Sequence, residues 1–153
     1  MLQKVIEINE LSTGASLLKK YISLYPTMID EVLKLLETNT LVLKAQNHTK
    51  ATFFGKRTPD DGLINWNWHK ERIKNWIRAQ SNPYPGAFAF YEDQKIIIDE
   101  IAFSDAGFSD LDVNGKIIQI KPALIVKTPN GCIEVVKMRS VEQIDFKIGN
   151  IFS

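Results

Sequence analysis

The spacing of hydrophobic residues separates a helical N-terminal part of the chain from a C-terminal part rich in strands. Residues 4–8 have the apolar content of a short strand, and residues 15–36 repeat apolar side chains at the spacing of an amphipathic helix. The Ser12-Thr13-Gly14 segment offers hydroxyl caps for that helix. Pro26 has no amide hydrogen, so we expect it to kink or interrupt the helix. The pattern predicts one strand–helix unit over residues 1–37.

Beyond that unit, residues 38–68 are expected to form a linker that ends in a turn. A second helix is predicted from about His69 to Gln80, with an apolar stripe on one side and basic residues on the other. Five short strands are predicted at 87–91, 95–101, 116–120, 123–127 and 132–138. The Asn114-Gly115 and Asn130-Gly131 pairs can supply positive φ between them. We therefore expect an α+β chain whose last part, residues 69–153, is a small antiparallel sheet or barrel.

Composition narrows the functional class only slightly. Hydrophobic residues at 44% and charged residues at 24% are ordinary for a globular domain, and the net charge is +1. That balance gives no general reason to expect nucleic acid or a membrane as partner. Cys132 is the only cysteine, so a Cys-based zinc site is excluded and a packed thiol is expected. No apolar stretch is long enough to span a bilayer and no signal peptide is evident, so a cytoplasmic location is the default expectation.

Two segments carry the most information, Lys50 to Trp66 and Ile77 to Phe88. Thr58-Pro59-Asp60-Asp61-Gly62 has the chemistry of a turn, with Pro fixing φ and Gly closing it. Pro83-Tyr84-Pro85-Gly86 is a second stiff turn before the first strand of the sheet. Two rigid turns joined by a basic helix predict a well-defined surface.

These segments resemble the stretch that joins the catalytic and C-terminal domains of formyltetrahydrofolate-dependent formyltransferases. The family includes methionyl-tRNA formyltransferase and enzymes that N-formylate amino sugars on nucleotide carriers. The usual sequence of this stretch in the family is Lys-Arg-x-Pro-Glu-Asp-Gly-x-Ile-x-Trp, followed by a helix with Ile-Arg-Ala and then by Pro-Tyr-Pro-Gly-Ala-Phe. Asp60 replaces the commoner Glu, and Asn65 stands where Asp is common before Trp66. The resemblance implies that residues 1–37 end a Rossmann-like catalytic domain and that residues 69–153 form an OB-like C-terminal domain.

The resemblance places the residues that carry the family's chemistry in the catalytic domain, and we identify none of them in this sequence. The family uses an Asn and a His separated by one residue and a distant Asp, for general acid–base and electrostatic roles. Of the two histidines here, His48 has Asn47 directly adjacent, and His69 follows Trp68. We therefore expect no catalytic, cofactor-binding or metal-binding residue in the chain, which should be inactive alone. 10-Formyltetrahydrofolate would be the co-substrate of the full-length enzyme only.

Three basic residues are candidates for contacts to substrate phosphates. Lys56, Arg57 and Arg78 lie in or beside the two informative segments, and arginine presents a forked donor that suits phosphate. The alternative, which we favour, is that Arg57 or Arg78 pairs with a turn carboxylate, Asp60 or Asp61, and braces the turn.

Aromatic residues are the other substrate-binding candidates. Trp66 and Trp68 could stack on a nucleotide base, although packing of the helix onto the sheet is favoured for at least one of them. Tyr84, between two prolines, is the best candidate for a substrate-facing aromatic, and a purely structural role is equally open.

Charge helps to choose between the substrates of the family. Residues 51–153 contain 13 Lys plus Arg and 13 Asp plus Glu, whereas a domain that grips tRNA should carry a basic face. The resemblance and this balance favour a nucleotide-linked amino sugar as substrate of the full enzyme. The alternatives are tRNA binding by the basic helix, as in methionyl-tRNA formyltransferase, and a stand-alone binding module that forms a homodimer.

Overall fold

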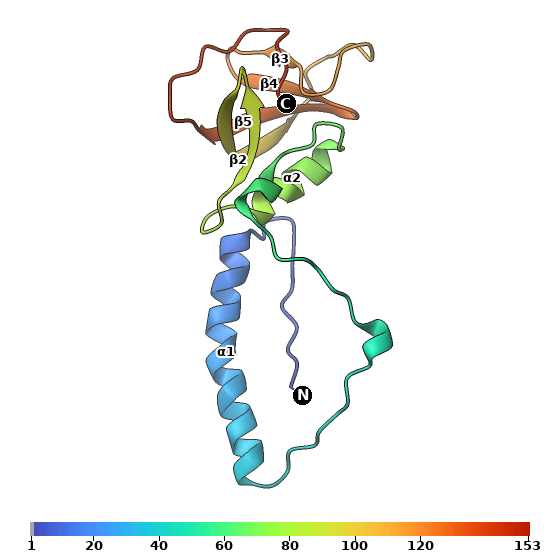
Figure 1. The fold of residues 1–153 in the computed structure, drawn as a ribbon, viewed down its shortest axis with the longest axis vertical. Helices are drawn as coiled ribbons and strands as arrows, with labels where there is room; N and C mark the ends of the chain where they lie inside the picture. The colour runs from blue at the N-terminus through green and yellow to red at the C-terminus, as the bar shows by residue number, and fades with distance from the viewer. Residues whose placement is uncertain (1) are drawn as a thin grey trace. The chain divides into compact units, whose positions relative to one another are not determined.

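The computed structural model describes residues 2–153, and these separate into two compact units, Met1–Arg57 and Thr58–Ser153 (Figure 1). The first contains helix α1 (Gly14–Glu37) and the single-turn helix η1 (His48–Lys50). The second contains the single-turn helix η2 (Pro59–Gly62), helix α2 (Lys70–Ala79) and five strands. The strands are β1 (Ala87–Tyr91), β2 (Gln94–Ser104), β3 (Ile117–Gln119), β4 (Leu124–Thr128) and β5 (Gly131–Arg139).

Helix α1 begins with the predicted hydroxyl cap. The Thr13 hydroxyl accepts from the Ser16 amide at 3.2 Å, and the Ser16 hydroxyl accepts from the Thr13 amide at 2.8 Å. This reciprocal pair satisfies amide donors that the first helical turn leaves free. The helix continues through Pro26, so the predicted interruption does not occur. A proline removes one backbone hydrogen bond, and those of the neighbouring turns hold the helix together.

The segment predicted as the first strand is extended but unpaired. Residues 2–9 run alongside α1 in the direction opposite to the helix, since Lys4 pairs with Glu31 at 2.8 Å and Lys20 donates to the Glu7 carbonyl at 3.2 Å. A strand needs a partner for its backbone groups, and the described residues supply none to this segment. Residues 4–8 are thus extended without forming a paired strand within the described chain.

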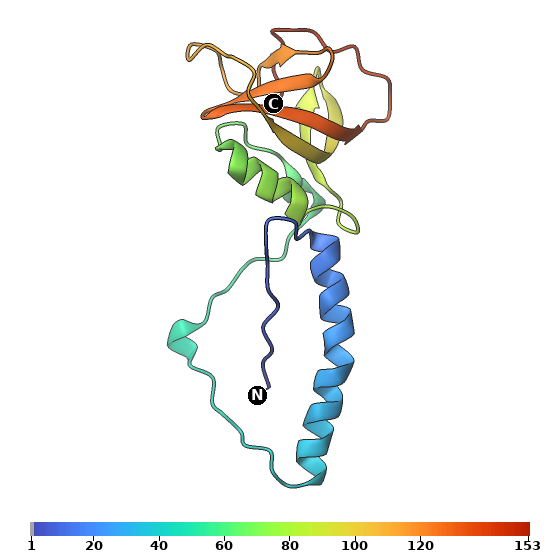
Figure 2. The same ribbon diagram turned by 180° about the vertical axis from the view of Figure 1, so that it is seen from behind.

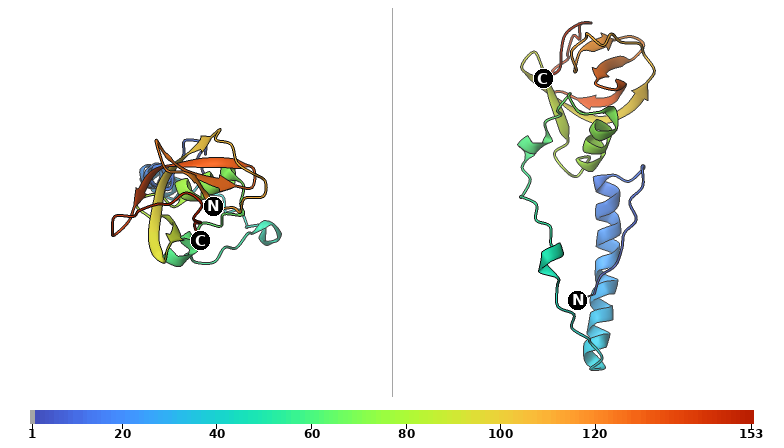
Figure 3. Two further views of the ribbon diagram at one scale, coloured as in Figure 1. Left: turned by 90° about the horizontal axis from the view of Figure 1, so that it is seen from above. Right: turned by 90° about the vertical axis from the view of Figure 1, so that its right-hand side faces the viewer.

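The second unit is a curled, antiparallel half-barrel with strand order β1-β2-β5-β4-β3. Helix α2 packs beside β2 and β5 (Figures 2 and 3). The five strands lie where the sequence predicts them, with ends displaced by three residues at most, and the α+β, OB-like fold is confirmed. At the β1–β2 turn Glu92 and Asp93 adopt φ of 46° and 66°, a conformation that more often uses Asn or Gly.

The core of the second unit is closed by its C-terminal residues. Phe152 is 2% exposed, and its ring lies 5.4 Å from that of Trp66 and 5.7 Å from that of Tyr91. Backbone bonds between Phe90 and Ser153, at 2.7 and 2.9 Å, hold the tail beside β1. Every buried hydrophobic residue of the described chain belongs to this unit. No helix among residues 2–153 is long and apolar enough to cross a membrane.

Candidate functional site

The two stiff turns predicted from the sequence meet in the second unit. A Cβ on Gly62 would lie 2.6 Å from the Gly86 carbonyl oxygen and 3.1 Å from Cδ1 of Phe88, so only glycine fits at this contact. Gly86 has a φ of 99°, which glycine adopts without strain. The Ile64 amide donates to the Phe88 carbonyl at 2.8 Å and continues the contact. The Thr58–Gly62 and Pro83–Gly86 turns are therefore in close contact within the second unit.

Tryptophan side chains join the first of these turns to helix α2. The Trp76 indole nitrogen donates to the Gly62 carbonyl at 3.3 Å, and the rings of Trp68 and Trp76 meet edge to face at 5.0 Å. Trp66 is 5% exposed and belongs to the hydrophobic core, where its ring stacks against Phe152. The structure thus gives Trp66 a packing position.

Helix α2 carries the basic surface that the sequence predicts. Lys70 and Lys74 place their ammonium groups 5.2 and 4.8 Å from the Phe103 ring centre, and Arg72 lies 4.2 Å from the Trp68 ring centre. These contacts hold the cations near the surface of the helix without neutralising them.

The N-terminus of α2 is closed by the protein itself. The Lys70 amide donates to Asn130 Oδ1 at 2.9 Å, and Asn130 Nδ2 donates to Glu71 at 2.9 Å. The hydrogen bond from Asn130 lowers the pKa of Glu71. This helix end is therefore occupied by the β4–β5 turn and is not an open anion site.

The candidate residues divide between the two units. Lys56 and Arg57 are exposed and end the first unit. Arg78 lies in the last turn of α2, half-buried, and its Nε donates to Asn75 Oδ1 at 2.8 Å. Tyr84 is 45% exposed in the second turn, with its amide bonded to the Ser81 carbonyl at 3.1 Å. Within the second unit, Arg78 and Tyr84 are thus candidates that solvent can reach.

The Thr58–Gly62 turn has an internal brace. The Asp61 carboxylate accepts from the Thr58 amide and from the Thr58 hydroxyl, the second at 3.1 Å. The Asp61 amide in turn donates to the Thr58 carbonyl at 3.2 Å, which closes the single turn of η2.

Other titratable groups of the second unit hold the fold together. The Arg139 guanidinium donates to both Asp99 oxygens, at 2.6 and 2.7 Å, and lowers the pKa of that carboxyl. Burial raises the pKa of the Cys132 thiol, as expected for a packed cysteine. No cluster of three or more His, Cys, Asp or Glu side chains that could hold a metal occurs in residues 2–153.

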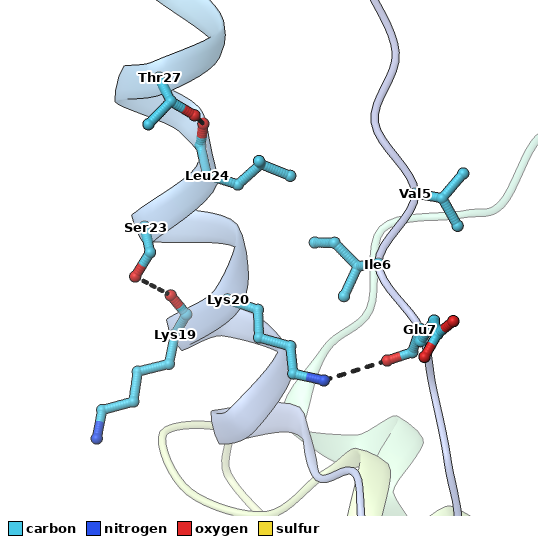
Figure 4. Close-up of a pocket in the computed structure, with 8 residues that line it drawn as sticks. All are labelled: Val5, Ile6, Glu7, Lys19, Lys20, Ser23, Leu24 and Thr27. Carbon is cyan, nitrogen blue, oxygen red and sulfur yellow. Dashed lines mark hydrogen bonds between the residues drawn. The ribbon is translucent and has the colours of Figure 1, made fainter.

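An open groove of about 780 Å³ lies in the first unit, between the extended segment and one face of α1 (Figure 4). It is lined by Val5, Ile6, Glu7, Lys19, Lys20, Ser23, Leu24 and Thr27. Leu24 and Ile6 point toward each other from the two sides, and Lys20 reaches the Glu7 carbonyl. Val5 of the extended segment is 93% exposed, and Ile29 of α1 is 48% exposed. Much of the apolar surface of the first unit is therefore uncovered.

One polar arrangement has no counterpart among the sequence-based candidates. Lys127 is 4% exposed and donates to Asn114 Oδ1 at 2.9 Å, and Asn114 Nδ2 donates to Asn67 Oδ1 at 2.9 Å. The three residues come from β4, the turn before β3 and the segment before α2. In the sequence these three residues share only their position beside an apolar run. That pattern is too common to identify them as a cluster.

Comparisons with known proteins agree with this fold and these segments. The protein-family model described as formyl transferase, C-terminal domain, matches residues 56–152. The bifunctional polymyxin resistance protein ArnA of Wigglesworthia glossinidia brevipalpis is 34% identical over 142 residues, which are 92% of this chain and 21% of the relative. The chain thus spans about a fifth of that relative's length.

A solved structure shows the same fold. HypX from Aquifex aeolicus, in a multiply substituted variant, superposes with a TM-score of 0.53 at 15% identity, over 74% of this chain and 20% of that one. At this identity the likeness concerns the fold alone. Because the family model covers well over half of the residues, the chain belongs to the formyl transferase C-terminal domain family.

Proposed function

We propose that the chain is the C-terminal portion of an enzyme that transfers a formyl group from 10-formyltetrahydrofolate to an amino sugar on a nucleotide carrier. The observation that carries this proposal is the family match over residues 56–152, which includes both rigid turns and the whole half-barrel. The proposed site of action is the cytoplasm.

The chain's own part in this reaction is to shape the substrate cleft and not to perform the chemistry. Lys56, Arg57, Arg78 and Tyr84 are the proposed substrate-facing residues, since they combine exposed or half-buried cations with one exposed aromatic ring. Trp66, the remaining sequence-based candidate, is buried and packs against Phe152. The sequence has one Asn-x-His triplet, Asn67-Trp68-His69, and it lies at the start of α2 inside the C-terminal domain match. We therefore infer that the catalytic groups come from elsewhere in the enzyme.

The first unit fits the end of a catalytic domain in this proposal. Its helix leaves Tyr21, Ile22 and Leu33 about half exposed, at 52%, 59% and 51%. Apolar surface on this scale is normally covered by another part of a protein. The remainder of the catalytic domain, or a second copy of the chain in a homodimer, would cover it.

Charge supports a sugar nucleotide over tRNA as substrate. The 13 basic and 13 acidic residues of residues 51–153 leave no net charge to neutralise phosphates, although α2 is locally basic. A tRNA-gripping domain would depend strongly on salt, because each neutralised phosphate releases counterions.

The coding sequence upstream of Met1 provides the decisive test. An in-frame segment that encodes Asn-x-His and a distant Asp is expected, and formyl transfer to a nucleotide-linked amino sugar should then be measurable in the longer protein. Unrelated sequence or stop codons there would refute the proposal.

Two binding measurements on the chain itself refine the test. Calorimetric titration with 10-formyltetrahydrofolate should give no heat of binding, and heat would contradict the proposed absence of a folate site. Filter binding of tRNA should be undetectable at about 0.15 M salt, where nonspecific dissociation constants lie at roughly 10⁻⁴–10⁻⁶ M. Tight, salt-dependent retention would favour the tRNA alternative. Sedimentation over a range of concentrations tests the homodimer.

A further inference from the structure

Helix α1 carries an apolar stripe that the rest of the described chain leaves largely exposed. Its side chains are spaced alternately by four and by three residues, and they are Leu18, Ile22, Tyr25, Ile29, Val32 and Leu36. This alternation averages about 3.5 residues, the period that keeps one line of side chains against a second helix. Ile22, Ile29 and Leu36 are 59%, 48% and 53% exposed. A stripe with this period and this exposure fits another helix as its partner.

The extended segment of the first unit lies against another side of α1. The groove between them is lined on the helix by residues that include Lys20, Leu24 and Thr27 (Figure 4). Residues two positions apart in an α-helix project about 160° apart around its axis. Lys20 and Thr27 therefore point away from Ile22 and Ile29. The apolar stripe stays open while the extended segment is in place.

The spacing of the stripe is the same when it is read from either end of the helix. A second copy of α1 laid antiparallel therefore places an apolar side chain opposite each member of the stripe. The facing pairs are Leu18 with Leu36, Ile22 with Val32, and Tyr25 with Ile29. A two-fold axis through such a pair makes every contact twice, as in other isologous interfaces.

Charge along α1 favours the antiparallel arrangement. Residues 14–25 contain two lysines, Lys19 and Lys20, and no acidic residue, so this half carries a charge of +2. Residues 26–37 contain three acidic residues and one lysine, so the other half carries −2. Antiparallel copies bring the basic half of each helix beside the acidic half of the other, whereas parallel copies bring like charges together. Opposite charges across an interface steer association and fix its register.

We propose that two copies of the 153-residue chain pack their α1 stripes antiparallel and form a two-fold symmetric dimer. Of the two covers considered for the first unit, the second copy is the one that the period and the charges of α1 fit. The inference rests on α1 alone and not on the proposed formyl transfer, so either can fail without the other.

Sedimentation equilibrium of the full chain from about 1 µM to 1 mM tests the pairing over the range of moderate dissociation constants. The mass should rise from 17.4 kDa toward twice that value. Ile29→Glu places a carboxylate at the centre of the stripe in both copies, and it should raise the dissociation constant of the dimer at least roughly tenfold. Thr27→Glu adds the same charge on the opposite side of α1, and it should leave that constant within about threefold of its original value.

Mixed disulfides test the antiparallel register. Leu18→Cys and Leu36→Cys variants, one of them enlarged by a tag, are mixed and oxidised, and a disulfide between the two variants is expected. Like positions lie about 27 Å apart in the antiparallel pair, since 18 residues separate them along the helix, so neither variant should cross-link to itself. The unsubstituted chain, whose Cys132 is buried, provides the background.

Three results would overturn the proposal. The first is a chain that stays monomeric up to about 1 mM, and the second is equal dissociation constants for Ile29→Glu and Thr27→Glu. The third is a disulfide within each cysteine variant without the mixed one, which would show parallel pairing. The disulfide test decides the case even where Ile29→Glu unfolds α1, because it introduces no charge into the stripe.

Discussion

Replacing Gly62 with alanine tests whether the contact between the two rigid turns holds the second unit together. The added Cβ would lie 2.6 Å from the Gly86 carbonyl oxygen and 3.1 Å from Cδ1 of Phe88. The first neighbour is backbone, and it cannot move aside by rotating a side chain. The Ile64–Phe88 backbone bond at 2.8 Å lies beside this contact and would be displaced with it. Overpacking of this kind costs about 1–3 kcal/mol of unfolding free energy.

Gly107→Ala provides the matched control. A Cβ on Gly107 would meet nothing within 4 Å, and the same change of residue should cost nothing or stabilise the protein by up to about 1 kcal/mol. Urea unfolding followed by tryptophan fluorescence should separate the variants by at least 1 kcal/mol, which for a unit of this size is roughly 4–8 °C in melting temperature. Equal stabilities of Gly62→Ala and Gly107→Ala would refute the close contact between the turns.

Three further changes follow from single features of the second unit. Phe152→Ala removes a 2%-exposed ring that stacks on Trp66, and denaturant unfolding should show a loss of about 3–5 kcal/mol. Because Arg139 lowers the folded-state pKa of Asp99, their bond stabilises the fold above the unfolded-state pKa of about 3.9 and is lost as pH falls through the folded-state pKa. Asp99→Asn should therefore lower the unfolding free energy at neutral pH and reduce the further loss of that free energy as the pH falls. An unchanged dependence of the unfolding free energy on acid pH would contradict this assignment. The buried Cys132, with its raised pKa, should react with a thiol reagent only after denaturant unfolds the chain, whereas fast labelling of the folded protein would show an open thiol.

Local chemistry explains which elements the sequence could predict. The Thr13 cap and the apolar repeat of α1 depend on neighbours within a few residues, and β1 occupies the same Ala87–Tyr91 range as predicted. Residues 4–8 form no strand within the described chain because a strand is defined by its partner, and no strand pairs with them there. Pro26 does not interrupt α1, since a long helix tolerates the loss of one hydrogen bond.

The candidate site was predictable only in part. The segments around Gly62 and Gly86 were recognisable as turns, but their contact is a tertiary event that turn chemistry does not encode. Burial of Trp66 likewise depends on Phe152, far away in the sequence. The Asn67–Asn114 bond joins residues separated by 47 positions, so no local pattern could place them together.

The distribution of the core leads to a last prediction, that residues 58–153 fold alone. All buried hydrophobic residues of the described chain lie between Ile64 and Phe152, and the first unit buries only Ser12 and Gly14. Stability follows buried apolar surface, so removing the first unit should cost little. A chain of residues 58–153 should melt within about 4 °C of the full protein, a difference worth roughly 1 kcal/mol. A chain begun at residue 69 loses Ile64 and Trp66 from the core and should unfold far more easily. Equal melting of the two shortened chains would place the boundary of the folding unit after Trp68, contrary to the packing of Trp66 on Phe152.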